Sequence, residues 1–228
     1  MHRVNVNYVL KRSKRKTVAI HITREATVEV RAPFHVPKAV IDSFINEKEP
    51  WIAKHLAVKE RLNSEKAHFA VVYGDMILFQ GKEYPVKDRE GNRTGFDGVC
   101  FYLPPNLTAT KIKDTLIQIY KGLSKKTLRQ KTEYFAKHMN VSPSAVKVGN
   151  AKTHWGSCSN SNSINFSWRL IMADEQTIDY VIVHELAHIK EHNHSLRFWS
   201  IVEAVLPDYK ERQKTLRGLQ ERLSKEDW

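Results

Sequence analysis

The chain has 228 residues, enough to bury a sizeable core in one large domain or two modest ones. Hydrophobic residues make up 41% of it and charged residues 27%, which excludes a disordered or collagenous protein. The formal net charge of +12 would attract polyanions such as nucleic acid or nucleotides. Because the basic residues are widely spread, charge alone indicates no more than a weak association with nucleic acid.

The start of the chain is basic but lacks the continuous apolar segment of a secretory signal. No stretch approaches the roughly 18 apolar residues of a membrane span. Cys100 and Cys158 lie far apart and show no spacing typical of a disulfide-stapled secreted domain. We therefore expect a cytoplasmic protein with two free thiols and no membrane partner.

The first third of the chain alternates apolar and polar residues, as the strands of a half-buried sheet do. The clearest runs are Val18 to Ile22 and Val28 to Val30. One helix is expected from Pro37 to Pro50 and another from Trp51 past Leu62. Short strands punctuated by glycines are then expected from Val71 to Leu103.

Near residue 105 the pattern changes from mostly β to mostly helical. Apolar residues at helical spacing predict a helix from Lys111 to Met139, and two strands follow, at Ala145 to Cys158 and at Ser163 to Leu170. We therefore predict an α+β fold with a β-rich amino-terminal portion, residues 1–105, and a helical catalytic portion, residues 106–228.

A last long helix is expected near residues 175 to 192, after Asp174, a residue suited to cap it. This helix is apolar nearly all round, so it must be central and buried. Ser195 is suited to cap a further helix, which would contain Phe198 and Trp199.

Ionisable residues interrupt the buried helix in the order His184-Glu185-Leu186-Ala187-His188. Burying them costs several kcal/mol unless something pairs them, and a metal ion would do so. Histidines four residues apart share one helix face, so both imidazoles can reach one cation at about 2 Å. Glu185, displaced by roughly 100°, is placed to act as the base that activates a metal-bound water. The alternative is that both histidines are hydrogen-bonded core residues.

A catalytic zinc ion usually takes three protein ligands and one water, so one ligand remains to be found. His194 comes six residues after His188 and reaches the metal if the helix ends and the chain reverses. Asn193 tolerates the left-handed conformation of such a helix end. Glu203 competes, because some zinc hydrolases take a carboxylate from the following helix. His192 is least favoured, since a straight helix carries it a further turn away. The spacing thus favours His194.

The segment from His154 to Cys158 is expected to form a strand that borders the cleft. In a functional interpretation it is an edge for substrate, with His154 donating a hydrogen bond to a developing oxyanion and Trp155 beside it. The alternative is a packed hairpin with a buried tryptophan and cysteine.

Ordered motifs run through the carboxy-terminal half of the chain. They are Trp155-Gly156-Ser157-Cys158, Trp168-Arg169-Leu170, Tyr180-Val181, His184 to His188, Asn193-His194-Ser195, Phe198-Trp199 and Pro207-Asp208-Tyr209. In this order they resemble the YgjP-like metallopeptidase family, which is zincin-like and related to the SprT-like metalloproteases. Weaker likeness extends over nearly the whole chain, in Arg31-Ala32-Pro33, Trp51-Ile52 and Gly81-Lys82-Glu83-Tyr84.

The resemblance implies a zincin-like catalytic half with metal-binding positions at His184, His188 and His194 and a catalytic Glu185. His154 departs from the pattern, which would have Arg or Lys before Trp-Gly-Ser-Cys, so a contact to an anion there is not inherited.

We therefore predict a zinc-dependent hydrolase. A metallopeptidase is favoured, because an extended strand beside the metal helix can pair with an extended peptide. One alternative, which the family resemblance also implies, is a metal-dependent nucleotide pyrophosphatase acting on UTP. The positive charge is helpful for that activity, but no glycine-rich phosphate loop is visible. The other is a nucleic-acid-associated binding module with a structural metal, which would have four protein ligands.

Overall fold

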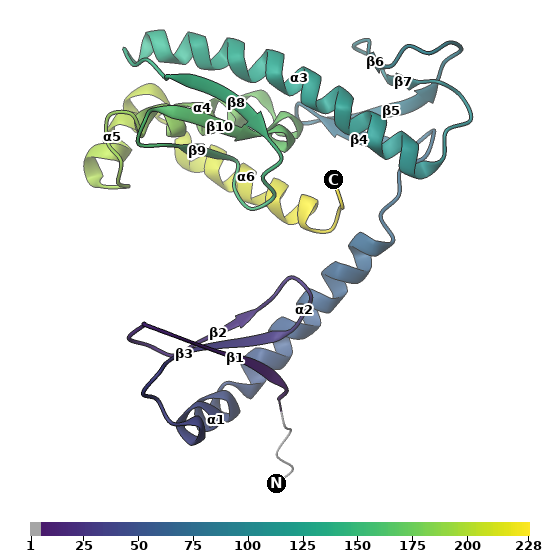
Figure 1. Ribbon diagram of the computed structural model, residues 1–228. Helices are drawn as coiled ribbons and strands as arrows, with labels where there is room; N and C mark the ends of the chain where they lie inside the picture. Colours follow the sequence, from purple (N-terminus) through teal and green to yellow (C-terminus); the bar gives the residue numbers. More distant parts are fainter. Residues whose placement is uncertain (1–5) are drawn as a thin grey trace. The chain divides into compact units, whose positions relative to one another are not determined.

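The structure is a computed structural model that describes residues 6–228, and it divides into two compact units (Figure 1). The first contains the residues up to Phe69 together with Ser224–Asp227, and the second contains Ala70–Leu223 and Trp228. Each unit combines strands with helices, which confirms the predicted α+β class. No helix among residues 6–228 has the length and apolarity needed to cross a membrane.

The first unit packs a small sheet against two helices. Its elements are β1 (Tyr8–Ser13), β2 (Ala19–Ile22), β3 (Val28–Pro33), α1 (Lys38–Glu47) and α2 (Glu49–Ala67). The strand order is β1-β3-β2, with β3 parallel to β1 and antiparallel to β2.

The core of the first unit follows the alternation that predicted its strands. Val28, Val30 and Ala32 point from β3 to the same side, and they are buried with Ile41 and Ile45 of α1. The predicted break between the two helices is confirmed, because Pro50 stands in the first turn of α2, where no backbone N–H is needed.

The second unit begins with a four-stranded sheet of order β4-β5-β7-β6. Its strands are β4 (Met76–Phe79), β5 (Lys82–Asp88), β6 (Gly95–Phe96) and β7 (Phe101–Leu103). They lie in the region between Val71 and Leu103 where the sequence predicts short strands.

The long helix α3 (Ala109–His138) packs on this sheet, and residue 105 therefore lies inside the second unit. Tyr120 of α3 has its ring centroid 5.2 Å from that of Phe101, and its hydroxyl donates to the Leu78 carbonyl at 2.8 Å. The compact units divide instead at residue 69. The change from strands to helix near residue 105 marks a change of secondary structure, whereas the core is continuous across it.

The second unit also contains a three-stranded sheet, which precedes the helix α4 (Glu175–Ala187) in the chain. It contains β8 (Ala145–Gly149), β9 (Gly156–Cys158) and β10 (Ser163–Ser167) in the order β8-β10-β9, and the short 3-10 helix η1 (Trp168–Met172) follows. The sequence predicts one strand from Ala145 to Cys158 and another to Leu170. Both are shorter, because side chains of residues 167 to 169 hold Asn150 and Ala151 in a loop.

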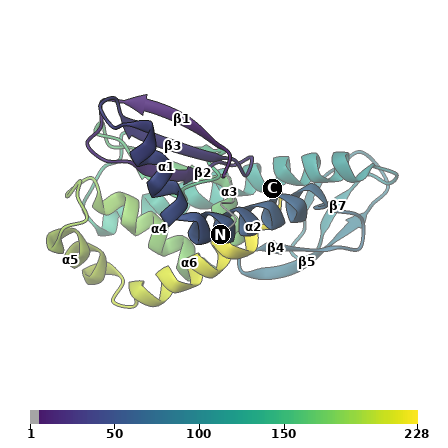
Figure 2. The same cartoon turned by 90° about the horizontal axis from the view of Figure 1, so that it is seen from below.

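Three helices complete the second unit: α4 (Glu175–Ala187), α5 (Leu196–Val205) and α6 (Tyr209–Ser224). Figure 2 shows α4 and α6 running alongside each other, and two hydrogen bonds join them, from Gln213 Nε2 to Tyr180 Oη and from Arg212 Nη1 to the Gln176 carbonyl. Ser195 caps α5 as predicted, by accepting a hydrogen bond from the Phe198 N–H.

The end of α4 differs from the sequence prediction. The helix stops at Ala187 and not near residue 192, and a turn over residues 188–190 follows. Asn193 does not adopt a left-handed conformation, so the expected role of that residue is wrong. The reversal is made by a turn in which Ile189 and Lys190 donate to the carbonyls of Leu186 and Ala187.

The start of α4 generates the first prediction. Asp174 accepts hydrogen bonds from the Thr177 N–H at 2.8 Å and from the Thr177 hydroxyl at 2.7 Å. Asp174→Ala should lower the free energy of unfolding by about 1–2 kcal/mol, because it leaves a helix N–H without a partner. Asp174→Asn keeps an acceptor and should cost much less. Urea unfolding measures both, and equal stability of Asp174→Ala and wild type would contradict the capping role.

Candidate metal centre

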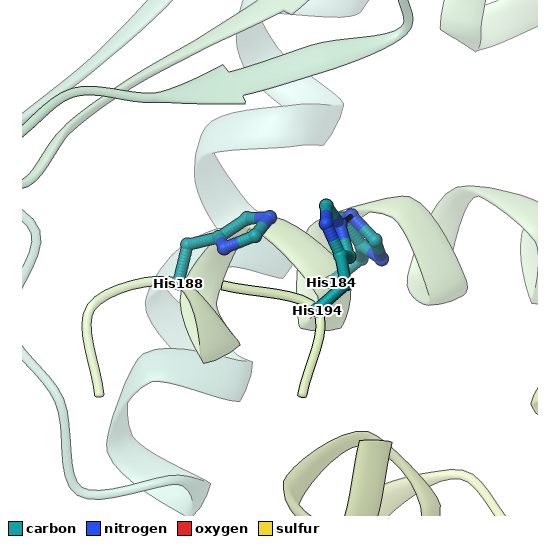
Figure 3. Close-up of side chains that lie close together, drawn as sticks. All are labelled: His184, His188 and His194. Carbon is teal, nitrogen blue, oxygen red and sulfur yellow. Dashed lines mark hydrogen bonds between the residues drawn. The ribbon is translucent and has the colours of Figure 1, made fainter. Parts of the chain in front are cut away.

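Three histidine rings gather where α4 ends and the chain turns back towards α5 (Figure 3). His184 lies in the last turn of α4, His188 is the residue that closes the helix, and His194 lies directly before the Ser195 cap of α5. Each offers a ligand nitrogen, and these atoms all lie within 4.8 Å of one another. In the described part of the chain no other group of three potential ligands is found.

The spacing of the nitrogens suits a single small cation. Nε2 of His184 is 3.1 Å from Nε2 of His194. In a tetrahedral zinc site with bonds of about 2.0–2.1 Å, two nitrogen ligands are separated by roughly 3.3 Å. The chain reversal therefore brings the third histidine to the distance that shared coordination requires.

Hydrogen bonding at His184 argues against the interpretation as a core histidine. Its Nδ1 is buried and has no hydrogen-bond partner, while its Nε2 meets only the nitrogen of another histidine. A histidine retained for packing would have its buried nitrogens paired with protein groups. His188 is oriented by its Nδ1, which lies 3.2 Å from the Glu191 carbonyl oxygen. If Nδ1 carries the proton, Nε2 of His188 presents its lone pair to a metal.

Burial favours the neutral form of the two histidine rings on α4, His184 and His188. Burial, and to a smaller extent the charges of His188 and His194, lowers the pKa of His184 to about 3. Burial likewise lowers the pKa of His188. A neutral imidazole is the form that binds a metal, so the ligand lone pairs are available without prior loss of a proton.

Aromatic side chains of α5 support the three histidines. Phe198 is fully buried, and its ring centroid lies 4.9 Å from that of His184, 4.5 Å from that of His188 and 4.7 Å from that of His194. Trp199 lies 5.8 Å from His194. Both residues lie on a helix that the sequence predicts, but their role at the site was not predicted. The sequence signal that could have found them is their position, three and four residues after the helix cap that follows His194.

Glu185 lies beside the histidines with its side chain against the backbone of β9. Only 6% of the residue is exposed, and burial raises the pKa of its carboxyl to about 7. A Cβ atom added to Gly156 would stand 2.6 Å from Cγ of Glu185 and 2.7 Å from Oε1. A side chain at position 156 would displace Glu185 from its present place, so glycine lets the strand and the carboxylate meet. This contact was not predicted from the sequence, although a glycine inside a predicted strand is a sign of close backbone approach.

Two candidate ligands from the sequence lie outside the histidine group. Glu203 is exposed on α5, and His192 is exposed in the turn between the helices. Neither belongs to the group of mutually close ligand atoms.

The two predicted substrate-binding residues precede β9. His154 is exposed, and its Nδ1 is hydrogen-bonded at 3.2 Å to the hydroxyl of Thr153. Trp155 is half-buried, and its carbonyl accepts from the Ser167 N–H at 2.8 Å. Their contact with a substrate stays a prediction.

Comparisons with known proteins bear on the class of this site. No curated protein matches the chain. The metallopeptidase zymogen abylysin of Pyrococcus abyssi is 21% identical, with a TM-score of 0.38, over 44% of this chain and 99% of its own. For the metallopeptidase zymogen jannalysin of Methanocaldococcus jannaschii the identity is 19% and the TM-score 0.37, over 40% and 94%. Neither likeness is used to assign the fold or the site of this chain.

The family comparison covers far more of the chain. The model for the YgjP-like, metallopeptidase domain matches residues 16–218, which cover most of both compact units and every residue of the histidine group. The chain belongs to the YgjP-like metallopeptidase family.

Proposed function

We propose that this protein is a zinc-dependent peptidase, in which His184, His188 and His194 hold the metal and Glu185 is the general base. The observation that carries the proposal is the convergence of three imidazoles beside one buried carboxylate. Membership of a metallopeptidase family supports hydrolysis of peptides. It gives no support to the nucleotide pyrophosphatase or to the nucleic-acid-binding module.

The donor set favours zinc and an open coordination position. Three imidazole nitrogens are typical ligands of catalytic zinc, which keeps a fourth position for water or substrate. When bound, such an ion polarises a carbonyl group and lowers the pKa of a water molecule towards 7. A structural zinc site would need a fourth protein ligand, and none joins the histidine group among residues 6–228.

Glu185 is placed to move the proton. Its carboxylate is held between α4 and β9, in surroundings that exclude most water. There it accepts a proton from the attacking water and returns it to the amine of the leaving peptide. Because it is displaced around the helix from both histidines of α4, Glu185 acts on the water without occupying a metal position.

The position of β9 favours an extended peptide as substrate. In the order β8-β10-β9 this strand is the last of its sheet, and it pairs only with β10 within that sheet. An extended peptide can add to such an edge through backbone hydrogen bonds. The contact of Gly156 with Glu185 brings this edge to the base. His154 and Trp155, which directly precede the strand, are proposed to contact the substrate at its end.

The cellular compartment stays a prediction. Both cysteines are free thiols, Cys100 buried and Cys158 half-buried, which agrees with the reducing cytoplasm expected from the sequence.

Glu185→Gln tests the assigned base. The variant should bind zinc as well as wild type does. Its rate of cleavage of denatured casein should be lower by about a hundredfold or more, because an amide cannot take the proton. Metal analysis and cleavage rates are measured on the same preparations. Loss of zinc from this variant would show instead that Glu185 is a ligand.

His194→Ala tests the third ligand. His194 is exposed, so the fold should survive, while the affinity for zinc should fall severely. The exposed residues His192 and Glu203 provide matched controls, and their alanine variants should keep full metal content. Full zinc in His194→Ala together with loss of zinc in Glu203→Ala would move the site to a two-histidine, one-glutamate type.

Gly156→Ala tests the contact between β9 and the base. The added methyl group would overlap the Glu185 side chain, so either the strand or the carboxylate must move. Cleavage should fall about a hundredfold, the effect of a small misplacement of a catalytic group, while zinc content is kept. Gly218→Ala is the matched control, because a Cβ there meets nothing within 4 Å. Equal activity of the two variants would contradict the assigned contact.

A further inference from the structure

A buried arginine joins two parts of the second unit that are distant in sequence, one of which leads to β9. Arg169 of η1 is 7% exposed. One of its terminal nitrogens, Nη1, donates to Asn150 Oδ1 at 3.1 Å, in the loop that follows β8. The other, Nη2, donates to the main-chain oxygen of Trp228. Arg169 therefore links the loop before β9 to residue 228.

The ring of Trp228 strengthens the same link. It is 5% exposed and packs edge-on against Tyr120, with centroids 5.6 Å apart. Tyr120 in turn stacks on Trp168, with centroids 5.7 Å apart. The indole nitrogen of Trp168 donates to Asn150 Oδ1 at 2.8 Å. Both donors to this oxygen, Trp168 and Arg169, are thus supported by Trp228, one through Tyr120 and the other directly.

The loop held in this way leads directly to the base. Ser167 binds it at two points, through its hydroxyl to the Ala151 carbonyl at 2.7 Å and through its N–H to the Trp155 carbonyl at 2.8 Å. The next residue is Gly156, whose backbone touches Glu185. The loop therefore connects Asn150 to Gly156, the residue that lies against the side chain of Glu185.

We propose that Trp228 is a positioning residue for Glu185. Docked on Tyr120 and Arg169, it holds the loop of residues 150–155 and so keeps the backbone of Gly156 against the carboxylate. Trp228 itself does not touch the reacting atoms. The consequence for peptide cleavage rests on the proposed function, whereas the consequence for the loop does not.

The test compares Trp228→Ala with Trp228→Phe and with a control, Tyr134→Ala, which removes an exposed aromatic ring from α3 of the same unit. Hydrogen exchange is followed in the zinc-loaded full chain. In Trp228→Ala the amides of residues 150–157 should exchange about tenfold faster, the effect of weakening one hydrogen bond, while the last third of α3, away from Tyr120, is unchanged. Trp228→Phe should restore most of the protection, and Tyr134→Ala should behave as wild type.

Asn150→Ala provides a second route to the same result. Asn150 is exposed, so its loss should leave the core intact while removing the acceptor that Trp168 and Arg169 share. The same local acceleration of exchange is expected. Unchanged exchange at residues 150–157 in Asn150→Ala, or acceleration spread evenly over the second unit in Trp228→Phe, would overturn the proposal.

Kinetics separate this proposal from the proposed function. In Trp228→Ala the rate constant kcat for peptide cleavage should fall about tenfold, because Glu185 loses the backbone that it rests against, and KM should rise, because His154 and Trp155 lie in the loosened loop. A wild-type protein that cleaves no peptide would refute the peptidase, and the exchange data would still decide whether Trp228 positions the loop. A lower kcat with unchanged exchange would count against the positioning role.

Discussion

The burial of ionisable side chains in an apolar helix is the constraint on which the site depends. Helix α4 is surrounded by core residues on nearly every side, yet it carries His184 and Glu185 in its last turn. Burial disfavours their charged forms, which keeps the imidazole neutral and the carboxyl pKa raised. A cation shared by neighbouring histidines would relieve this cost, because it pairs the ring lone pairs and attracts the carboxylate.

The rest of the second unit supplies what α4 cannot provide by itself. A helix offers two histidines on one face, and the third ring must come from a chain that returns. The early end of α4 at Ala187 and the cap of α5 at Ser195 produce that return within a few residues. Phe198 then packs against all three rings and fixes their relative positions. Strand β9 approaches α4 so closely that a side chain at residue 156 would displace that of Glu185.

Local patterns in the sequence were sufficient for most of the elements and for the ligand set proposed, but not for the end of α4 or for the limits of β8, β9 and β10. The four-residue spacing of His184 and His188 requires only helix geometry, and the preference for His194 requires only that the helix stop. Strand alternation in Val28 to Ala32 and the helix caps at Asp174 and Ser195 are likewise local properties, and the structure contains them.

Features that depend on tertiary packing could not be predicted in this way. Residue 105 marks a change of composition, but Tyr120 packs its ring across it onto the preceding strands. The contact between Gly156 and Glu185 joins residues 29 positions apart, and nothing in either local pattern specifies it. The turn after α4 shows a subtler limit, because the chain reverses without the left-handed residue that such reversals commonly use.

The central claim is that three histidines hold a metal with one coordination position left for chemistry. X-ray absorption spectroscopy of the zinc-loaded protein measures this directly, because it reports the number, type and distance of the ligands. The account predicts three imidazole nitrogens and one oxygen at about 2.0 Å from zinc. A fourth protein ligand, such as a fourth imidazole or the sulfur of Cys158 at about 2.3 Å, would mean a closed structural site and would contradict it.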